Sequence, residues 1–153
     1  MKKIVLASLL AFFVMNIYSY GQMLEPKEGA NKKWGFVDET GELVIPYKYE
    51  QASGFYEGLA AVRVKGKWGY IDKSGEVVIP FKYTIAASFS GELASVMKSN
   101  GKFGFIDKTG TVVLPIKYTS YREAAEAAIA IGIYQDLDPG MLKCKGTIDE
   151  TVL

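Results

Sequence analysis

The sequence predicts a mainly β protein, built as an open array of antiparallel β-hairpin units of about 34 residues each. Three observations support this fold class. A block of sixteen residues recurs at 34–49, 68–83 and 103–118, and successive copies are identical at ten positions. Each copy contains an Asp-x-x-Gly tetrapeptide, which is typical of β-turns. Aromatic or β-branched runs of strand length flank that tetrapeptide on both sides.

Each recurring block is expected to form one hairpin. The turn begins with an aspartate, whose carboxylate can accept backbone hydrogen bonds, and ends with a glycine, which tolerates a positive φ. The aspartates are Asp38, Asp72 and Asp107, and the glycines are Gly41, Gly75 and Gly110. An aromatic strand should precede the turn, over 34–37 and 68–71, and a β-branched strand should follow it, over 43–45 and 77–79. A further strand, over 59–64 and 93–98, should turn into the next aromatic strand.

A proline follows the β-branched strand in every copy, as Pro46, Pro80 and Pro115. Because proline has no N–H to donate to a strand ladder, we expect each of these residues to end its strand. The residues after the proline should then form the loop that leads to the next unit.

The repeated aromatic residues are expected to be structural. An aromatic ring followed by glycine fits a side chain packed across a strand where another backbone comes close; the pairs are Trp34-Gly35, Trp68-Gly69 and Phe103-Gly104. The alternative for these rings is an exposed platform for a sugar or a peptide. The tyrosines that close each block should fill the joints between units, with stacking on a glycan as the alternative; they are Tyr49, Tyr83 and Tyr118.

The chain is expected to divide into four parts. Residues 1–21 have two lysines, an apolar stretch and small residues at the end, as in a signal peptide cleaved between Gly21 and Gln22. The alternative is a retained anchor, but the apolar stretch is short for a membrane span. Residues 22–31 lead into the repeats at 32–118, which divide into 34–67, 68–102 and a partial unit at 103–118. The expected location is the periplasm, the cell surface or the extracellular space.

Residues 119–153 are expected to cap the open end of the array. Ser120 and Glu123 have the spacing of a capping box, which predicts a short helix over 123–131 that continues into a strand. The apolar side of that helix would consist of Ala125, Ala128, Ile129, Gly132 and Ile133. The competing interpretation is a degenerate further repeat, since Ile129, Ile131 and Ile133 alternate as in a strand.

The composition excludes several chemistries. The chain has no histidine and a single cysteine, Cys144, so it can form neither a His-dependent catalytic triad nor an internal disulfide. We expect no cofactor and no metal; a calcium site at the turn aspartates would need a ladder of further carboxylates that the sequence lacks. A formal net charge of +1 gives no sign of a nucleic-acid partner. Cys144, between two lysines, is expected to be a spare exposed thiol.

The repeated motifs resemble those of the WG-repeat proteins. The resemblance rests on Glu57-Gly-Leu-Ala60, on Gly66-Lys-Trp-Gly-Tyr-Ile-Asp-Lys73 and on Val78-Ile-Pro80 through Tyr83, and it covers about 32–118. The third copy departs from the pattern with Phe103 in place of Trp and with an inverted Gly91-Glu92 pair. The resemblance implies a bacterial β-repeat array without established catalytic activity, and it supplies no catalytic residue.

The expected function is therefore non-catalytic, the presentation of an extended surface to a protein or another component of the cell envelope. One alternative is a glycan or cell-wall binding module with exposed aromatic rings. A second alternative is a hydrolase in which Glu57, Glu92 and the turn aspartates serve as acid and base. Association of copies through the sheet edges is a further expectation.

Overall fold

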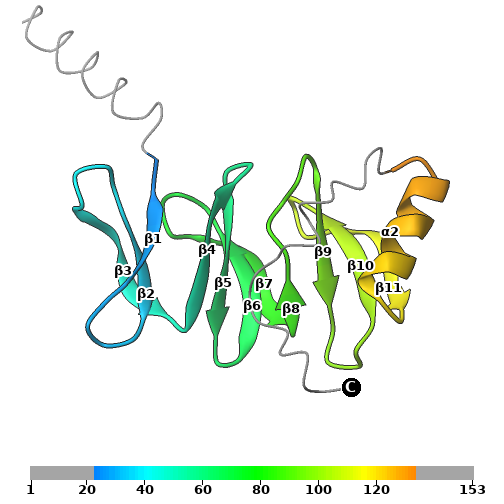
Figure 1. Ribbon diagram of the computed structural model, residues 1–153, viewed down its shortest axis with the longest axis horizontal. Helices are drawn as coiled ribbons and strands as arrows, with labels where there is room; N and C mark the ends of the chain where they lie inside the picture. The colour runs from blue at the N-terminus through cyan, green and yellow to red at the C-terminus, as the bar shows by residue number, and fades with distance from the viewer. Residues whose placement is uncertain (1–22, 134–153) are drawn as a thin grey trace, which may run out of the picture.

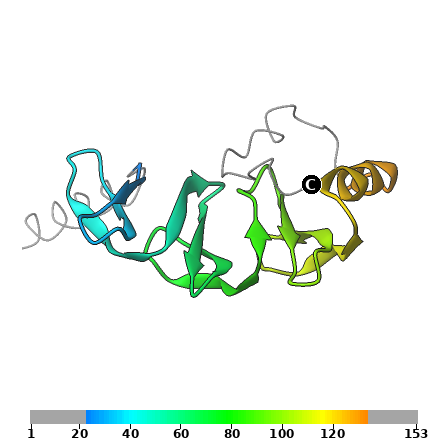
Figure 2. The ribbon, with the colours of Figure 1, turned by 60° about the horizontal axis from the view of Figure 1, so that its bottom comes forward.

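A computed structural model describes residues 23–133 and shows three antiparallel sheets arranged in a row, with one helix at the far end (Figures 1 and 2). The first sheet has three strands, β1 (Glu25–Glu28), β2 (Trp34–Val37) and β3 (Leu43–Tyr49). The second has four, β4 (Gln51–Tyr56), β5 (Leu59–Val64), β6 (Lys67–Ile71) and β7 (Val77–Tyr83). The third has β8 (Ile85–Ala86), β9 (Leu93–Met97), β10 (Phe103–Asp107) and β11 (Val112–Tyr118), and helix α2 (Tyr121–Ala130) follows. The predicted mainly β, open array is confirmed.

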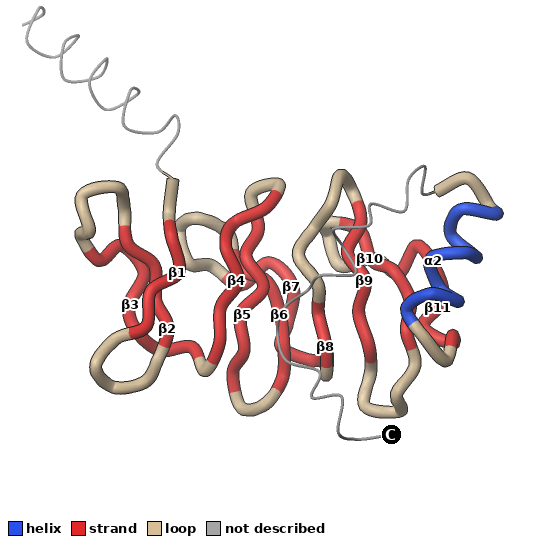
Figure 3. Tube along the Cα trace, viewed as in Figure 1, coloured by secondary structure: helices blue, strands red, loops and turns tan. Residues whose placement is uncertain are grey.

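The sheets do not coincide with the sequence repeats. The second sheet spans 51–83, so it combines the later half of the repeat at 34–67 with the first half of the repeat at 68–102. The third sheet is offset in the same way. Each 34-residue repeat therefore belongs to two neighbouring sheets and ties them together covalently (Figure 3).

The prediction that the prolines end their strands is wrong. Strand β3 passes through Pro46 and continues to Tyr49, and β7 and β11 likewise pass through Pro80 and Pro115. The pairing shifts between Phe36↔Ile45 and Trp34↔Tyr49, so that residues 46–48 lie opposite the single residue 35. Because a bulge interrupts the regular ladder at this point, proline's missing N–H does not end the strand.

The glycine after each repeated aromatic residue is required by this bulge. A Cβ atom on Gly69 would lie 2.5 Å from the carbonyl oxygen of Ile79, and one on Gly35 would lie 2.5 Å from that of Ile45. The third copy has the same geometry, with 2.6 Å from Gly104 to the oxygen of Leu114. The predicted close approach of backbone to glycine is confirmed.

Three strands were not expected from the sequence. Strand β1 lies in the lead-in and pairs with β2 as β5 pairs with β6, with Glu25 opposite Val37 and Ala60 opposite Ile71. Strands β4 and β8 lie where a loop was predicted after the proline. Strand β4 is rich in small and polar residues, and its pairing with β5 is irregular between Ala52 and Phe55, whereas β8 has only two residues.

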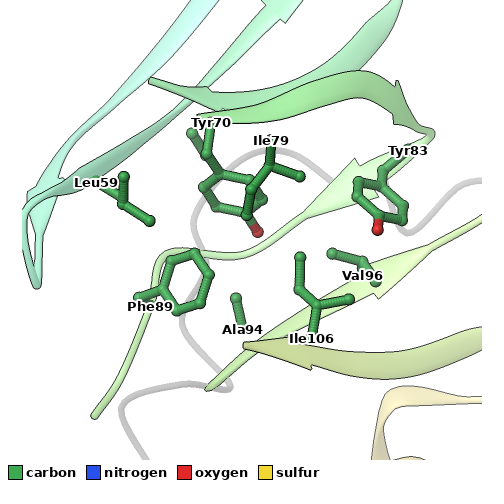
Figure 4. Packing of buried hydrophobic residues seen from close by; sticks show 9 residues of the cluster. Leu59, Tyr70, Ile79, Tyr83, Phe89, Ala94, Val96 and Ile106 are labelled. Atoms are coloured by element: carbon green, nitrogen blue, oxygen red, sulfur yellow. The ribbon is translucent and has the colours of Figure 1, made fainter. Parts of the chain in front are cut away.

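The core consists of three clusters in succession, each formed where one layer packs on the next. The first joins the first two sheets through residues such as Phe36, Ile45 and Val62. The second joins the second and third sheets, and Figure 4 shows Tyr70 and Ile79 on one side of it. The third lies between the last sheet and helix α2.

The predicted helix is confirmed, and it begins two residues earlier than expected. The strand expected to continue it does not begin in 131–133, which form a turn. The Ser120 side chain accepts a hydrogen bond from the Glu123 backbone N–H at 3.1 Å, while the Glu123 carboxylate accepts one from the backbone N–H of Thr119 at 2.8 Å. The buried face consists of Ala124, Ala125 and Ala128. Ile129, which the prediction placed on the apolar side, is exposed.

Candidate interaction surface

Most of the repeated aromatic residues serve the core. Tyr49 and Tyr83 are buried, and Tyr118 is partly buried beside the helix. Trp34, Trp68 and Phe103 are partly buried, and each packs against one of the core clusters. The structural role predicted for these rings is confirmed, and the buried tyrosine rings offer no face on which a sugar could stack.

A lysine lies over the closing tyrosine in every unit. The ammonium nitrogens of Lys48, Lys82 and Lys117 are 5.2, 5.3 and 5.5 Å from the ring centroids of the tyrosines that follow them. Attraction between a cation and an aromatic face favours this arrangement. This weak contact favours a position of each lysine over the ring of its own unit.

The turn aspartates act within their own turns. Oδ1 of Asp72 accepts hydrogen bonds from the backbone N–H groups of Ser74 and Glu76, at 2.9 and 3.0 Å, and from the Ser74 hydroxyl. Asp38 and Asp107 have the same arrangement. The hydrogen bond from the hydroxyl group is the main reason that the pKa of each carboxyl is lowered; desolvation opposes it, and the backbone hydrogen bonds add to the lowering. The predicted turn role is confirmed, with the turn glycines at a φ of 85°.

Two glutamates converge on one lysine at the junction of the second and third sheets. Lys108 Nζ lies 3.5 Å from Glu57 Oε2, in the β4–β5 turn, and 3.0 Å from Glu92 Oε1, in the β8–β9 turn. The hydrogen bond to Glu92 is the main reason that the pKa of Lys108 is raised. Two of the carboxylates that the sequence suggested as acid and base, Glu57 and Glu92, are thus held in ion pairs with a half-buried lysine.

Pairs of aliphatic side chains are exposed at the same place in all three sheets. They lie at the start of β3, β7 and β11, each of which is an edge strand of its sheet. These aliphatic pairs are Leu43-Val44, Val77-Val78 and Val112-Val113, with exposed fractions between 37% and 52%. Sequence reasoning treated these residues only as strand formers. Each pair stands at a bulge, because the pairs Phe36↔Ile45 and Val37↔Leu43 leave Val44 as an extra residue, and β7 and β11 repeat this shift; the sequence carried no local signal for it.

Two other features are absent from the part of the chain that the structure describes, a metal-ligand cluster and a membrane-spanning helix. Between residues 23 and 133, no three acidic, histidine or cysteine side chains gather as metal ligands. Within the same range, no helix has the length and apolar character needed to cross a membrane. The signal cleavage site at Gly21 and Gln22, the tail after 133 and Cys144 lie outside the described residues.

Of three comparisons with known proteins, one gives a match. Neither the curated proteins nor the solved structures contain a significant match to the chain. The model of a protein family described as WG containing repeat matches three consecutive segments, 34–68, 68–103 and 103–126. These segments cover more than half of the chain and include every bulge, aspartate turn and aliphatic pair described above. The chain is therefore a member of the WG-repeat family.

Proposed function

We propose that this protein is a non-catalytic binding protein whose aliphatic pairs form one extended surface for another protein. The observation that carries the proposal is the repetition of these exposed pairs on the edge strands of all three sheets. Exposed apolar side chains in a series are costly unless a partner covers them, and an edge strand also offers free backbone groups. A single exposed valine would need no explanation, but three equivalent pairs do.

A protein partner suits this surface better than a glycan does. Binding of a neutral sugar by stacking would require exposed aromatic rings, whereas Tyr49 and Tyr83 are buried. Of the described tyrosines, Tyr56 has the largest exposed fraction, and it stands outside the sixteen-residue motif. The pairing of edge strands with a second copy of the chain would use the same surface, so the oligomeric state is part of the test.

A hydrolase is the less favoured alternative. A general acid needs a carboxyl whose pKa is raised, and the pKa of each turn aspartate is lowered instead. Glu57 and Glu92 are held by Lys108, and neither is buried. Export of the protein, directed by residues 1–21, remains part of this proposal, and it would place the surface in the cell envelope or outside the cell.

The test is capture of partners from an envelope extract with the purified protein as bait. The triple variant Val44→Thr, Val78→Thr and Val113→Thr keeps the β-branched shape and removes apolar surface from each pair. A matched control, Ile85→Thr, Ile129→Thr and Ile131→Thr, makes the same kind of change at exposed positions elsewhere. We expect the first variant to lose partners that the wild type and the control retain. Equal capture by all three proteins would contradict the proposal, and light scattering would show whether the partner is a second copy.

A further inference from the structure

Two lysines flank the same cross-strand aromatic pair in every unit. Lys33 precedes Trp34 and Lys48 precedes Tyr49, and Trp34 is paired with Tyr49 between β2 and β3. The pairs Trp68↔Tyr83 and Phe103↔Tyr118 repeat the arrangement. We call these side chains the lysine rim: Lys33, Lys48, Lys67, Lys82, Lys102 and Lys117.

The lysine rim follows one long edge of the array. The aromatic pairs lie at the ends of the hairpins opposite the aspartate turns, next to the β1–β2, β5–β6 and β9–β10 connections. All three connections lie along the lower edge in Figure 1. The aliphatic pairs begin β3, β7 and β11, and therefore stand at the other end of these strands.

Charge is divided between the two edges. The edge opposite the lysine rim carries Asp38, Asp72 and Asp107 together with Glu57 and Glu92. That edge also carries Lys73 and Lys108, and the formal net charge of +1 does not show how the charges are distributed between the two edges. A local field depends on the distribution of charge and falls off within about 10 Å at 0.1 M salt, so a molecule near the lysine rim senses mainly the lysines.

The lysines of the rim have no carboxylate partner within 4 Å among residues 23–133. Carboxylates at this edge are engaged elsewhere: Glu50 accepts a hydrogen bond from the backbone N–H of Gly66 at 2.9 Å and pairs with Arg63, and Glu123 caps helix α2. Lys48, Lys82 and Lys117 are exposed and are held over their tyrosine rings. Each unit thus offers one exposed lysine held over a ring. The second lysine is half-buried, and in the first and third units, as Lys33 and Lys102, it lies close enough to Glu50 and Glu123 to add to the lowering of the pKa of these carboxyls, which hydrogen bonds mainly cause.

We propose that the lysine rim binds an anionic polysaccharide that lies along the array. A chain with regularly spaced negative groups can contact equivalent lysines in successive units, which gives several weak contacts the combined strength of one stronger interaction. Recognition would rest on charge, since the rings between the lysines are turned into the core. Single-stranded nucleic acid would need exposed rings for base stacking, so it fits this edge less well.

The experiment measures binding of the purified protein to heparin, a sulfated polysaccharide probe, with neutral dextran as the blank. The variant Lys48→Gln, Lys82→Gln and Lys117→Gln should bind heparin about tenfold or more weakly at low salt. The control Lys73→Gln and Lys108→Gln removes two charges at the opposite edge and should bind nearly as well as the wild type, whereas the charge-matched variant Lys48→Gln and Lys82→Gln should bind more weakly. Replacement of the same three rim lysines by Arg should preserve binding.

Several outcomes would overturn the proposal. Equal weakening by the two double glutamine variants would mean that only net charge matters. Tighter binding of the wild type to a thymidine oligonucleotide than to heparin would assign the edge to nucleic acid. If the wild type fails to bind heparin and light scattering shows that it self-associates, the edge would be assigned to a second copy of the chain. If the first variant does not fold, Lys33→Gln, Lys67→Gln and Lys102→Gln test the same rim through its other row. The aliphatic pairs are intact in every variant, so these results do not depend on the proposed protein partner.

Discussion

The same sheet face is covered in two different ways along the molecule. At the internal joints, a recurring aromatic residue, isoleucine and tyrosine of one sheet pack against β-strands of the next sheet. At the C-terminal end, the equivalent residues Phe105, Leu114 and Tyr118 pack against three alanines of helix α2. The two packing layers, a further sheet and helix α2, differ in the volume of the side chains that they contribute. They also differ in whether their other side leaves an edge strand that must be paired or covered.

The helix can end the array because its backbone N–H and C=O groups form hydrogen bonds within the helix itself. A further sheet would cover Phe105 equally well, but it would present another face and another edge strand to be covered. A helix forms its hydrogen bonds internally, and the small side chains of Ala124, Ala125 and Ala128 let it come close to the sheet. The comparison shows that the repeated face specifies an apolar cover and accepts more than one kind of secondary structure.

The largest expected effect comes from a buried charge at each kind of joint. Ala94→Asp would place a carboxylate in the cluster between the second and third sheets, where Ala94 is fully buried, and should cost about 4 kcal/mol or more and unfold the array. Ala128→Asp should instead release the helix and leave the sheets folded. Hydrogen exchange by mass spectrometry separates the two results, and global unfolding by Ala128→Asp would show that the helix is part of one cooperative unit.

Loss of side-chain volume should also distinguish the joints. Ile79→Ala removes a fully buried side chain that packs against the third sheet and against the turn at Gly110, and we expect a loss of about 3 kcal/mol in unfolding free energy. Leu114→Ala, under the helix, should cost less, because the helix can settle onto the smaller side chain. Urea denaturation measures both values; a larger loss for Leu114→Ala would contradict the difference between the joints.

The helix cap provides a local test. Ser120→Ala removes the hydroxyl that accepts from the Glu123 backbone N–H, which should destabilise the helix by about 1 kcal/mol. Faster exchange should be confined to the amides of α2, and the strands of the second sheet should be unchanged. Ser120→Asp, which restores an acceptor, should return the exchange rate to that of the wild type.

Two tyrosines of one internal joint should respond differently to removal of the hydroxyl group. Tyr70 donates a hydrogen bond to the Ala87 carbonyl oxygen at 2.7 Å, so Tyr70→Phe should cost about 1 kcal/mol. The Tyr83 hydroxyl is buried and has no hydrogen-bond partner among the described residues, and burial raises its pKa. Tyr83→Phe should therefore leave stability unchanged or slightly increase it. A loss equal to that of Tyr70→Phe would reveal a bridging water at Tyr83.

The smallest expected effect is a response to acid. The pKa of the turn aspartates is lower in the folded protein, so their contribution to stability is present above the unfolded value, near 3.8, and is lost as the pH falls through the folded value. Thermal stability should thus decline below about pH 4. The variant Asp72→Asn and Asp107→Asn keeps the oxygen acceptor and should show a smaller decline, whereas an unchanged pH profile would argue against this linkage.

The sequence was sufficient for features that depend on neighbouring residues. The turn at Asp72 and the cap at Ser120 follow from side chains that bond to backbone within a few positions, and the recurrence of the sixteen-residue block indicated the array. It was insufficient where pairing between strands decides the outcome. Pro46 stays within β3 because a bulge opposite Gly35 removes the need for a donor, and the positions of the lysines along one edge depend on the register of the aromatic pairs.

The exposed residues show the same limit. Val78 and Ile129 have the character of core residues, yet Val78 lies near the start of an edge strand and Ile129 on the open side of the helix. Strand β1 was hidden because its residues, Glu25 to Glu28, retain the pairing of β5 without its apolar pattern. Burial is set by which layer comes next, and no local pattern carries that information.

The offset between repeats and sheets has a consequence for how such a chain can change its length. Because one 34-residue period supplies the later half of a sheet and the first half of the next, duplication of one whole period at any phase restores complete four-stranded sheets on both sides of the insertion. Deletion of a period works in the same way, and the terminal helix still meets the face it covers. The molecule can therefore lengthen or shorten by whole periods without a redesigned boundary, and the lysine rim and the aliphatic pairs would lengthen in step.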